Sequence, residues 1–286
     1  MTSKPNLPSE TTFMIDFNLE WVAAAAMAPD VPPAAAAAMF GITEDELAAY
    51  SAYVQDQVDR TAAELLSEND IADGVDRLPV PRGGTVMAVG DSITTYRCGY
   101  AELLRAMIAA RRPGDDIQFV NEGRAGYTST HGLESTYTQF LAKQPDLVFV
   151  MFGVNDCKRL GGPEAGTLVS IDAYRDNVAA IVHAFVEHTL ALPVLLTPTP
   201  VVESLVSTNA DFSAMRLTWD NADIEACADV VRDVADRQRL PVVDLMSAFG
   251  PSPDPSLYLE DGLHPGPTGH RLITQCMVGE LTPNHA

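Results

Sequence analysis

The stretch TVMAVGDS, residues 85–92, decides the fold class of this chain. Its first six residues form a mostly apolar run, which is typical of a strand buried on both faces of a parallel sheet. Leu103, Met107 and Ile108 then recur at helical spacing before Pro113. The stretch therefore predicts the first strand and helix of an α/β domain.

The same alternation of strand and helix continues towards the C-terminus. Four further apolar runs predict strands at 117–121, 146–153, 193–200 and 240–245. Helical patterns fall at 171–190, 220–239 and about 267–281. Five strands that alternate with helices favour an open parallel sheet covered on both faces. We therefore predict an α/β fold, a flavodoxin-like three-layer sandwich whose five-stranded parallel sheet has the order 2-1-3-4-5.

The first 80 residues differ in composition from the rest of the chain. They hold 14 acidic and 3 basic residues, whereas the remaining 206 hold 25 and 15, within a net charge of −21. The segment DRLPVPRGG, residues 76–84, has the prolines and glycines of a linker. We therefore predict an acidic helical appendage over residues 1–80 and an α/β domain over residues 81–286.

Helix signals fill the acidic appendage. A helix is predicted at 10–27, and Pro33 and Gly41 fit the start and end of a short one. Thr43 and Glu46 fit a capping box for the next helix. Its apolar face follows at steps of three or four residues: Leu47, Tyr50, Val54, Val58, Ala62 and Leu65. Such a face requires burial, so the appendage is expected to cap a cleft or to form an oligomer interface.

Composition also excludes several classes of function. A charge of −21 repels phosphate backbones, which argues against a nucleic-acid partner. No apolar stretch of 18 residues lacks charges or paired prolines, so no membrane span is expected. The N-terminus lacks a basic region followed by an apolar one, so we expect a cytoplasmic protein. The four cysteines form no CxxC pair, which predicts free thiols and neither a metal site nor a disulfide scaffold.

Polar motifs follow four of the five predicted strands: the first, the second, the third and, through a loop, the fifth. They are Gly90-Asp91-Ser92, Asn121 to Gly126, Gly153 to Asp156, and Asp261 to Pro265. In open parallel sheets, ligands bind outside the carboxyl ends of the strands, where the strand order reverses. These motifs are therefore expected to meet at one end of the sheet.

The ordered set GDS, a glycine after the second strand, GxND and DxxH resembles the SGNH (GDSL-type) hydrolases, over roughly residues 85–281. Ile93 stands where a leucine is usual. Ala125 and Tyr127 depart from the serine and the acid that many relatives carry around the second-block glycine. The resemblance implies an SGNH-type hydrolase domain that needs no cofactor. Residues 1–80 match no known pattern.

Three residues are expected to carry the chemistry. Ser92 is the predicted nucleophile, since its hydroxyl would lie at the cleft between a strand and a helix start; on its own it would be an ordinary helix cap. His264 is the predicted base. Asp261 lies three residues earlier, where its carboxylate could orient the imidazole; alternatively the pair is a surface turn and an incidental histidine.

The resemblance also implies an oxyanion hole. Its donors would be the Ser92 N–H, the Gly126 N–H and the side-chain amide of Asn155. The alternative for Gly126 is a plain turn glycine, and for Asn155 a cap residue. Asp156 is expected to brace its loop rather than to transfer protons.

Several residues near the motifs could bind substrate. Arg97, Arg124 and Lys158 would steer an anionic substrate, or else pair with surface carboxylates. Tyr127 lies in the second block. Trp219 belongs to residues 201–221, which could fold over the cleft as an apolar lid or pack on the core.

The resemblance implies that the protein is a serine esterase. By that resemblance it would hydrolyse a carboxylic ester, with a small acetyl-like acyl group on a sugar or small metabolite, through a Ser-His-Asp triad and an acyl-enzyme. The small-molecule ester is the expected partner, and a homo-oligomer through the N-terminal helices is an open possibility. The alternatives are an acyltransferase or thioesterase with the same triad, or a non-enzymatic α/β binding module.

Overall fold

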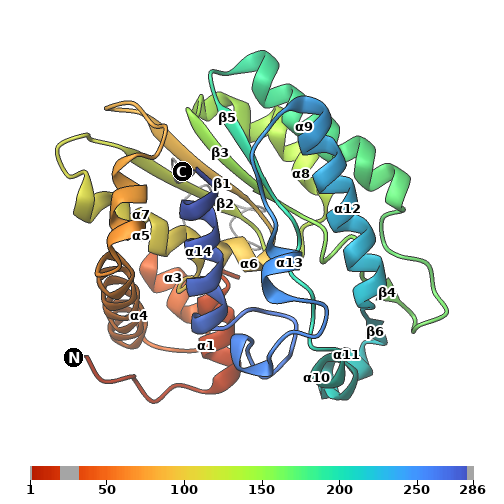
Figure 1. Ribbon diagram of the computed structural model, residues 1–286. Coiled ribbons are helices and arrows are strands. Elements are labelled where there is room, and N and C mark those ends of the chain that lie inside the picture. Colours follow the sequence, from red (N-terminus) through yellow and green to blue (C-terminus); the bar gives the residue numbers. More distant parts are fainter. Residues whose placement is uncertain (1, 20–31, 282–286) are drawn as a thin grey trace.

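A parallel sheet of five strands forms the centre of the molecule (Figure 1). The structure, a computed structural model, describes residues 2–19 and 32–281. The strands lie in the order β2-β1-β3-β5-β7, which confirms the predicted order of the five main strands. Their bounds are β1 Thr85–Gly90, β2 Gln118–Gly123, β3 Leu147–Met151, β5 Leu192–Leu196 and β7 Val242–Val243.

The central strands are buried and their ends are aligned. Every residue of β3 is buried, as expected of a strand covered on both faces. Gly90 at the end of β1 pairs with Gly123 of β2 on one side and with Met151 of β3 on the other. The carboxyl ends of these three strands therefore form one edge, which is where the motif residues begin.

Four strands differ in length from the prediction. The third covers Leu147–Met151 rather than 146–153. The second runs on to Gly123, because Glu122 and Gly123 keep pairing with β1. The fourth ends at Leu196 rather than at 200, where prolines interrupt the following segment. The fifth is reduced to Val242–Val243.

Helices cover both faces of the sheet, as predicted (Figure 1). On one side α8, α9 and α12 pack against one another, and on the other α7 packs with α5 and α14. The bounds are α6 Ser92–Thr95, α7 Tyr100–Arg111, α8 Ser129–Ser135, α9 Ile171–His188, α10 Glu203–Thr208, α11 Ala210–Ala214, α12 Asn221–Gln238, α13 Leu245–Phe249 and α14 Pro267–Leu281. A small antiparallel pair joins β4 (Arg159–Leu160) to β6 (Leu217–Thr218).

The N-terminal helices are α1 Ser9–Asp16, α3 Pro33–Met39, α4 Glu44–Leu66 and α5 Asn69–Asp76. Pro33 begins α3, and the capping box of Thr43 and Glu46 begins α4, as predicted. The helix predicted at 10–27 is shorter, because α1 ends at Asp16 and a turn follows; residues 20–27 lie outside the described residues.

Helix α4 connects these helices to the sheet domain. Its first half packs into a small cluster with Ile15 of α1, and its second half joins the main core through Leu65. Leu78 and Val80, in the segment predicted as a linker, are also buried in that core. The predicted linker is therefore packed chain rather than a free connection.

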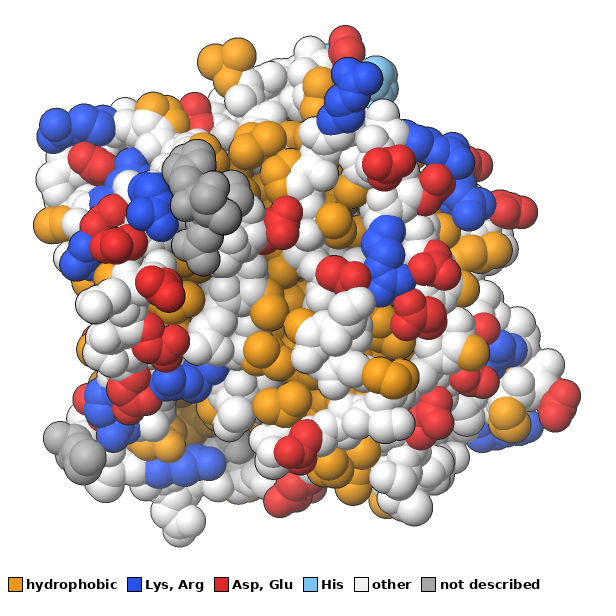
Figure 2. Space-filling view, viewed as in Figure 1, with side chains coloured by type: hydrophobic (Ala, Val, Ile, Leu, Met, Phe, Trp, Pro, Cys, Tyr) orange, Lys and Arg blue, Asp and Glu red, His pale blue; other side chains and the backbone are white. Residues whose placement is uncertain are grey.

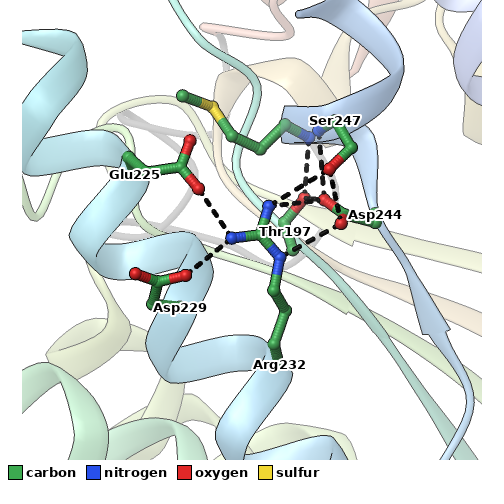
Figure 3. A network of polar contacts seen from close by, with 7 residues as sticks. Thr197, Glu225, Asp229, Arg232, Asp244 and Ser247 are labelled. Atoms are coloured by element: carbon green, nitrogen blue, oxygen red, sulfur yellow. Dashed lines mark hydrogen bonds and ion pairs between the residues drawn. The ribbon is translucent and has the colours of Figure 1, made fainter. Parts of the chain in front are cut away.

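An ion-pair network fixes α12 to the end of the sheet (Figure 3). Arg232 of α12 pairs with Glu225 and Asp229 of its own helix and with Asp244, which directly follows β7. Burial alone would raise the pKa of Asp244, but its hydrogen bonds with Arg232 and Ser247 outweigh burial and lower it. The network holds β7 and α13 against α12.

None of the helices described in this structure is long and apolar enough to cross a membrane. On the face seen in Figure 2, Lys and Arg side chains are interspersed with Asp and Glu rather than gathered into one basic patch.

Candidate active site

Ser92 lies at the junction of β1 and α6. Asp91 caps the helix by accepting a hydrogen bond from the Ile93 N–H at 2.9 Å. A side chain at Gly90 would collide with Thr94 Oγ1 and approach the Met151 carbonyl oxygen to 2.6 Å. Glycine therefore allows the tight turn that brings the Ser92 side chain to the end of the sheet.

Three side chains form a hydrogen-bonded chain at this edge. Ser92 Oγ lies 2.9 Å from His264 Nε2, and His264 Nδ1 lies 2.6 Å from Asp261 Oδ2. Because an ionised carboxylate only accepts, Nδ1 carries the proton and Nε2 is free to accept the Ser92 hydroxyl proton. This is the geometry of a nucleophile, its base and an orienting acid.

The Asp261 carboxylate is partly buried, and hydrogen bonds from the protein satisfy both of its oxygens. Oδ1 accepts hydrogen bonds from the backbone N–H groups of Leu263 and His264, at 2.9 and 3.0 Å. Burial alone would raise the pKa of Asp261, but the hydrogen bonds and the charge of His264 outweigh burial and lower it. The acid therefore stays ionised at neutral pH, as its position beside the imidazole requires.

Gly126 and Asn155 line the same cleft as Ser92 and His264. Gly126 has a φ of +82° in a turn closed by the bond from the Tyr127 N–H to the Arg124 carbonyl oxygen, which fits the third position of a type II turn. The amide Nδ2 of Asn155 donates to the Tyr127 carbonyl oxygen at 3.1 Å. That bond holds the amide group at the cleft that Ser92 also lines.

Two further carboxylates are buried next to the site. Burial raises the pKa of Asp91 and that of Asp156 to about 6. Asp156 accepts hydrogen bonds from the Ser129 N–H at 3.0 Å and from the Ser129 hydroxyl at 2.5 Å. Asp156 thus ties the third motif to the start of α8, which fits a bracing role.

The cleft has a volume of about 180 Å³. Of the five predicted substrate-binding residues, Lys158 and Trp219 line it. The Lys158 ammonium donates to Asn155 Oδ1 at 3.3 Å. Trp219 is buried and its indole N–H donates to the Val154 carbonyl oxygen, so only its apolar surface can face a ligand.

The other three predicted substrate-binding residues do not line this cleft. Arg97 donates through Nε to Asn18, and Arg124 pairs with Glu122. The Tyr127 ring stacks on His131, with 4.9 Å between ring centroids. The predicted gathering of positive charge therefore leaves one cation, Lys158, among the described residues that line the cleft.

Residues 201–221 both pack on the core and line the cleft, the two alternatives considered for them from the sequence. They fold into α10, α11 and β6 and pack on the core through Val206. Phe212, Leu217 and Trp219 also line the cleft. The segment is thus a packed wall of the site.

Sequence reasoning expected the N-terminal appendage to cap a cleft or to form an oligomer interface, but it named no residue of the wall that the appendage supplies. Phe13, Phe17 and Leu19, on α1 and the turn after it, line the cleft with Ser92. The Phe17 ring lies 4.5 Å from the His264 ring, centroid to centroid. No motif marks these residues, and only the apolar face predicted for the appendage indicated that it covers something.

Among the described residues, no group of three or more His, Cys, Asp or Glu side chains is placed to hold a metal ion. His270 is buried, and burial lowers its pKa to about 3. It accepts a hydrogen bond from the Tyr100 N–H, so its role is structural.

Comparison with known proteins agrees with this geometry. Residues 88–272, well over half of the chain, match the GDSL-like lipase/acylhydrolase family. The chain belongs to this family. The match includes Ser92, Asp261 and His264, and it leaves residues 1–87 outside.

Similar proteins include two named esterases. The chain is 24% identical over 200 residues to the human isoamyl acetate-hydrolyzing esterase 1 homolog, covering 66% of this chain and 77% of the relative. It is 24% identical over 225 residues to an acetylxylan esterase of Geobacillus stearothermophilus, covering 71% of this chain and 96% of the relative.

Solved structures share the fold. The acetylxylan esterase Axe2 of Geobacillus stearothermophilus superimposes with a TM-score of 0.57 at 22% identity, covering 71% of this chain and 96% of that one. LAE5, an α/β hydrolase from the metagenome of Lake Arreo, gives a TM-score of 0.56 at 23% identity, covering 71% and 97%.

Proposed function

We propose that this member of the acylhydrolase family is a serine esterase that cleaves a small carboxylic ester through an acyl-enzyme on Ser92. The observation that carries the proposal is the continuous hydrogen-bonded chain from Ser92 Oγ through both nitrogens of His264 to Asp261. A serine hydroxyl becomes a useful nucleophile only when a base takes its proton, and this arrangement supplies that base.

The proposed reaction proceeds in two halves. As Ser92 Oγ attacks the ester carbonyl carbon, its proton passes to His264 Nε2, and Asp261 stabilises the imidazolium. The tetrahedral intermediate then collapses, and His264 gives the proton to the departing alkoxide oxygen. In the second half a water molecule loses its proton to His264 and attacks the acyl-enzyme, which frees the acid and restores the Ser92 hydroxyl.

Negative charge on the carbonyl oxygen would be stabilised by three donors. We assign these to the backbone N–H groups of Ser92 and Gly126 and to the Asn155 amide, because all three residues line the cleft. A preorganised donor of this kind contributes about 3–4 kcal/mol to the transition state.

The substrate is proposed to carry a small acyl group. The cleft volume of about 180 Å³ lies below the range typical of sites for drug-sized ligands. The names of the two similar esterases refer to acetyl esters, one of a short alcohol and one of a polysaccharide. An acetyl-like acyl group is therefore the first choice for assay.

The proposal is tested by turnover of p-nitrophenyl acetate, butyrate and octanoate. Wild type should hydrolyse the short esters, and Ser92→Ala should lose at least about 1,000-fold in kcat, with an unchanged circular dichroism spectrum. Ser67→Ala, at an exposed serine after α4, is the matched control and should keep wild-type turnover. Full activity in a folded Ser92→Ala variant would refute the proposal.

A further inference from the structure

Helix α1 and the turn after it lie directly against the triad. Phe17 is 2% exposed, and its ring lies against that of His264. Phe13 packs on Phe17 with 4.6 Å between centroids and is 43% exposed, so its outer face is open to a ligand. These residues belong to the part of the chain outside the family match, so the wall they form is an addition to the hydrolase domain.

The segment is held in place by bonds to the residues that follow Ser92. The Arg97 N–H donates to the Asp16 carbonyl oxygen at 2.8 Å. The Asn18 side chain donates to the Thr95 carbonyl oxygen at 2.9 Å and accepts from Arg97 Nε at 2.6 Å. These three hydrogen bonds join the end of α1 and the turn after it to residues 95–97, just beyond Ser92. They fix the positions of Phe13 and Phe17 relative to Ser92.

A second connection comes from helix α4. The Tyr50 hydroxyl hydrogen-bonds to the Asp16 carboxylate, with 2.9 and 3.0 Å to its two oxygens. Ile15, on the same turn of α1, is fully buried in the cluster with Tyr50. The aromatic wall therefore rests on a packed support.

The opposite wall is also apolar. Phe212 and Trp219 lie 5.0 Å apart, centroid to centroid, and Leu217 and Leu263 complete the lining. The Trp219 indole N–H is already used by the backbone. Among the lining residues that the structure describes, the polar side chains are those of Ser92, Asn155, Lys158 and His264.

This distribution of polarity selects a class of substrate. A sugar ring requires several hydrogen-bonding partners, and leaving its hydroxyls unpaired on apolar walls would be unfavourable. An alkyl or aryl group instead gains from burial between two apolar walls. The small volume of the cleft, about 180 Å³, favours a short group of this kind.

Resting on the proposed esterase function, we propose that the α1 segment is a substrate-specificity wall, and that the preferred substrate is an ester whose group next to the carbonyl or the ester oxygen is a short apolar chain. Phe13 and Phe17 contact that chain from one side, and Phe212, Leu217 and Trp219 contact it from the other. The ester of a carbohydrate is accordingly a poor substrate.

The test uses the full-length protein and two ester series. One varies the acyl chain from acetate to octanoate on p-nitrophenol, and the other varies the alcohol from methyl to pentyl on acetate. Phe13 is the residue to change, because it is partly exposed, whereas Phe17 is buried against His264 and its truncation would disturb the base as well as the wall. Phe13→Ala should lower kcat/KM for the best four- to five-carbon ester about 10-fold and for the shortest ester less than about 2-fold.

Two further variants and one further substrate complete the design. Phe13→Leu keeps an apolar side chain and should restore most of the chain-length preference. Tyr137→Ala, at an exposed aromatic residue away from the cleft, should leave the preference unchanged. Wild type should prefer butyl or pentyl acetate over an acetylated xyloside by at least about 10-fold in kcat/KM.

The outcomes separate this inference from the proposed function. If Ser92→Ala abolishes turnover but Phe13→Ala lowers kcat/KM equally for every ester, the esterase assignment stands and the specificity wall is wrong. The same conclusion follows if the acetylated xyloside is the better substrate. If Ser92→Ala keeps its turnover, the proposed function itself fails.

Discussion

At the scale of single residues, the site depends on a carboxylate, that of Asp261, which is partly buried and still charged. Asp261 holds its charge because one oxygen accepts two backbone N–H bonds and the other faces the His264 ring. Its lowered pKa means that the ionised form persists well into acid, and is lost only as the pH falls through that lowered value. The imidazole is therefore oriented over the whole neutral range.

The first prediction removes this charge and keeps the shape. Asp261→Asn should lower kcat about 1,000- to 10,000-fold, because the amide can donate to Nδ1 and so favours the wrong tautomer of His264. Steady-state kinetics on p-nitrophenyl acetate measure the loss. Glu260→Gln, at the exposed neighbouring acid, should leave kcat within about 2-fold, since surface carboxylates away from the site contribute little. A fully active Asp261→Asn variant would argue against a triad.

The residues of this chain differ in how far sequence could place them. Ser92 and His264 were predicted to meet because motifs at the ends of parallel strands share one edge, a property of the backbone alone. Arg97 and Arg124 were expected at the cleft because they lie close to the motifs in sequence, but closeness in sequence does not determine where a side chain points. Each turns to a partner that the fold supplies, Asn18 for the first and Glu122 for the second.

At the scale of elements, α1 and α4 are joined by a hydrogen bond to the Asp16 carboxyl, whose pKa is shifted by burial. Burial raises the pKa of Asp16 from 3.8 to about 6, although the Tyr50 hydrogen bond and the charges of Arg97 and Lys4 oppose the shift. Asp16 lies where α1 meets α4. The ionised form of this carboxyl is therefore a source of instability at neutral pH.

The second prediction concerns that carboxyl. A raised folded-state pKa gives stability that is present below the unfolded value and lost as the pH rises through the folded value. The stability of Asp16→Asn relative to wild type should therefore rise as the pH is raised from 4 to 8. The rise in this difference in free energy of unfolding should be up to about 3 kcal/mol. Urea unfolding at both pH values measures the gain, and exposed Asp176→Asn on α9 is the control. Equal effects at both pH values would contradict the assignment.

The third prediction concerns the network of Figure 3. Arg232→Ala should destabilise the protein by about 1–3 kcal/mol at pH 7, because it leaves Asp244 without its partner. The loss should shrink as the pH falls through the lowered pKa of Asp244, where the wild-type pair is itself lost. Arg237→Ala removes an exposed pair with Asp233 and should cost less than about 1 kcal/mol. Thermal unfolding with both variants decides between a network and a surface pair.

The strand order was predictable, whereas some element ends were not. Right-handed crossovers leave few possible orders for five alternating strands and helices. The end of the second strand depends on Glu122 and Gly123 finding partners in β1, which the local sequence does not state. The docking of α1 on His264 depends likewise on contacts with residues more than 70 positions away, such as Thr95.

At the scale of the whole molecule, the second half of α4 and helix α5 share the core of the sheet domain, whereas α1, α3 and the first half of α4 form a smaller cluster. Val58 and Leu65 of α4, with Leu78 and Val80 after α5, pack into the cluster that contains the sheet. The excess of acidic residues in 1–80 is therefore a difference in composition, and it does not coincide with a boundary in the hydrophobic core. Helix α4 is thus needed to bury the outer face of α7 and α14, against which it packs.

The fourth prediction compares two truncations. Removal of residues 1–31 takes away α1 and keeps α4, so the protein should stay folded and lose its chain-length preference. Removal of residues 1–82 exposes the main core and should yield aggregated or unfolded protein. Size-exclusion chromatography and circular dichroism show whether each truncated protein is monomeric and folded, and the two ester series measure its chain-length preference. A soluble, monomeric and equally active product of the longer truncation would show that the N-terminal helices are dispensable.

The central claim is that Ser92 carries the acyl group during turnover. The most direct measurement is to quench the reaction with p-nitrophenyl acetate in acid and to map the modified peptide by mass spectrometry. We predict one acetyl group, located on Ser92, in wild type and none on the same peptide in Ser92→Ala. Turnover without any acetylated Ser92, and with the adduct on another residue, would contradict the account.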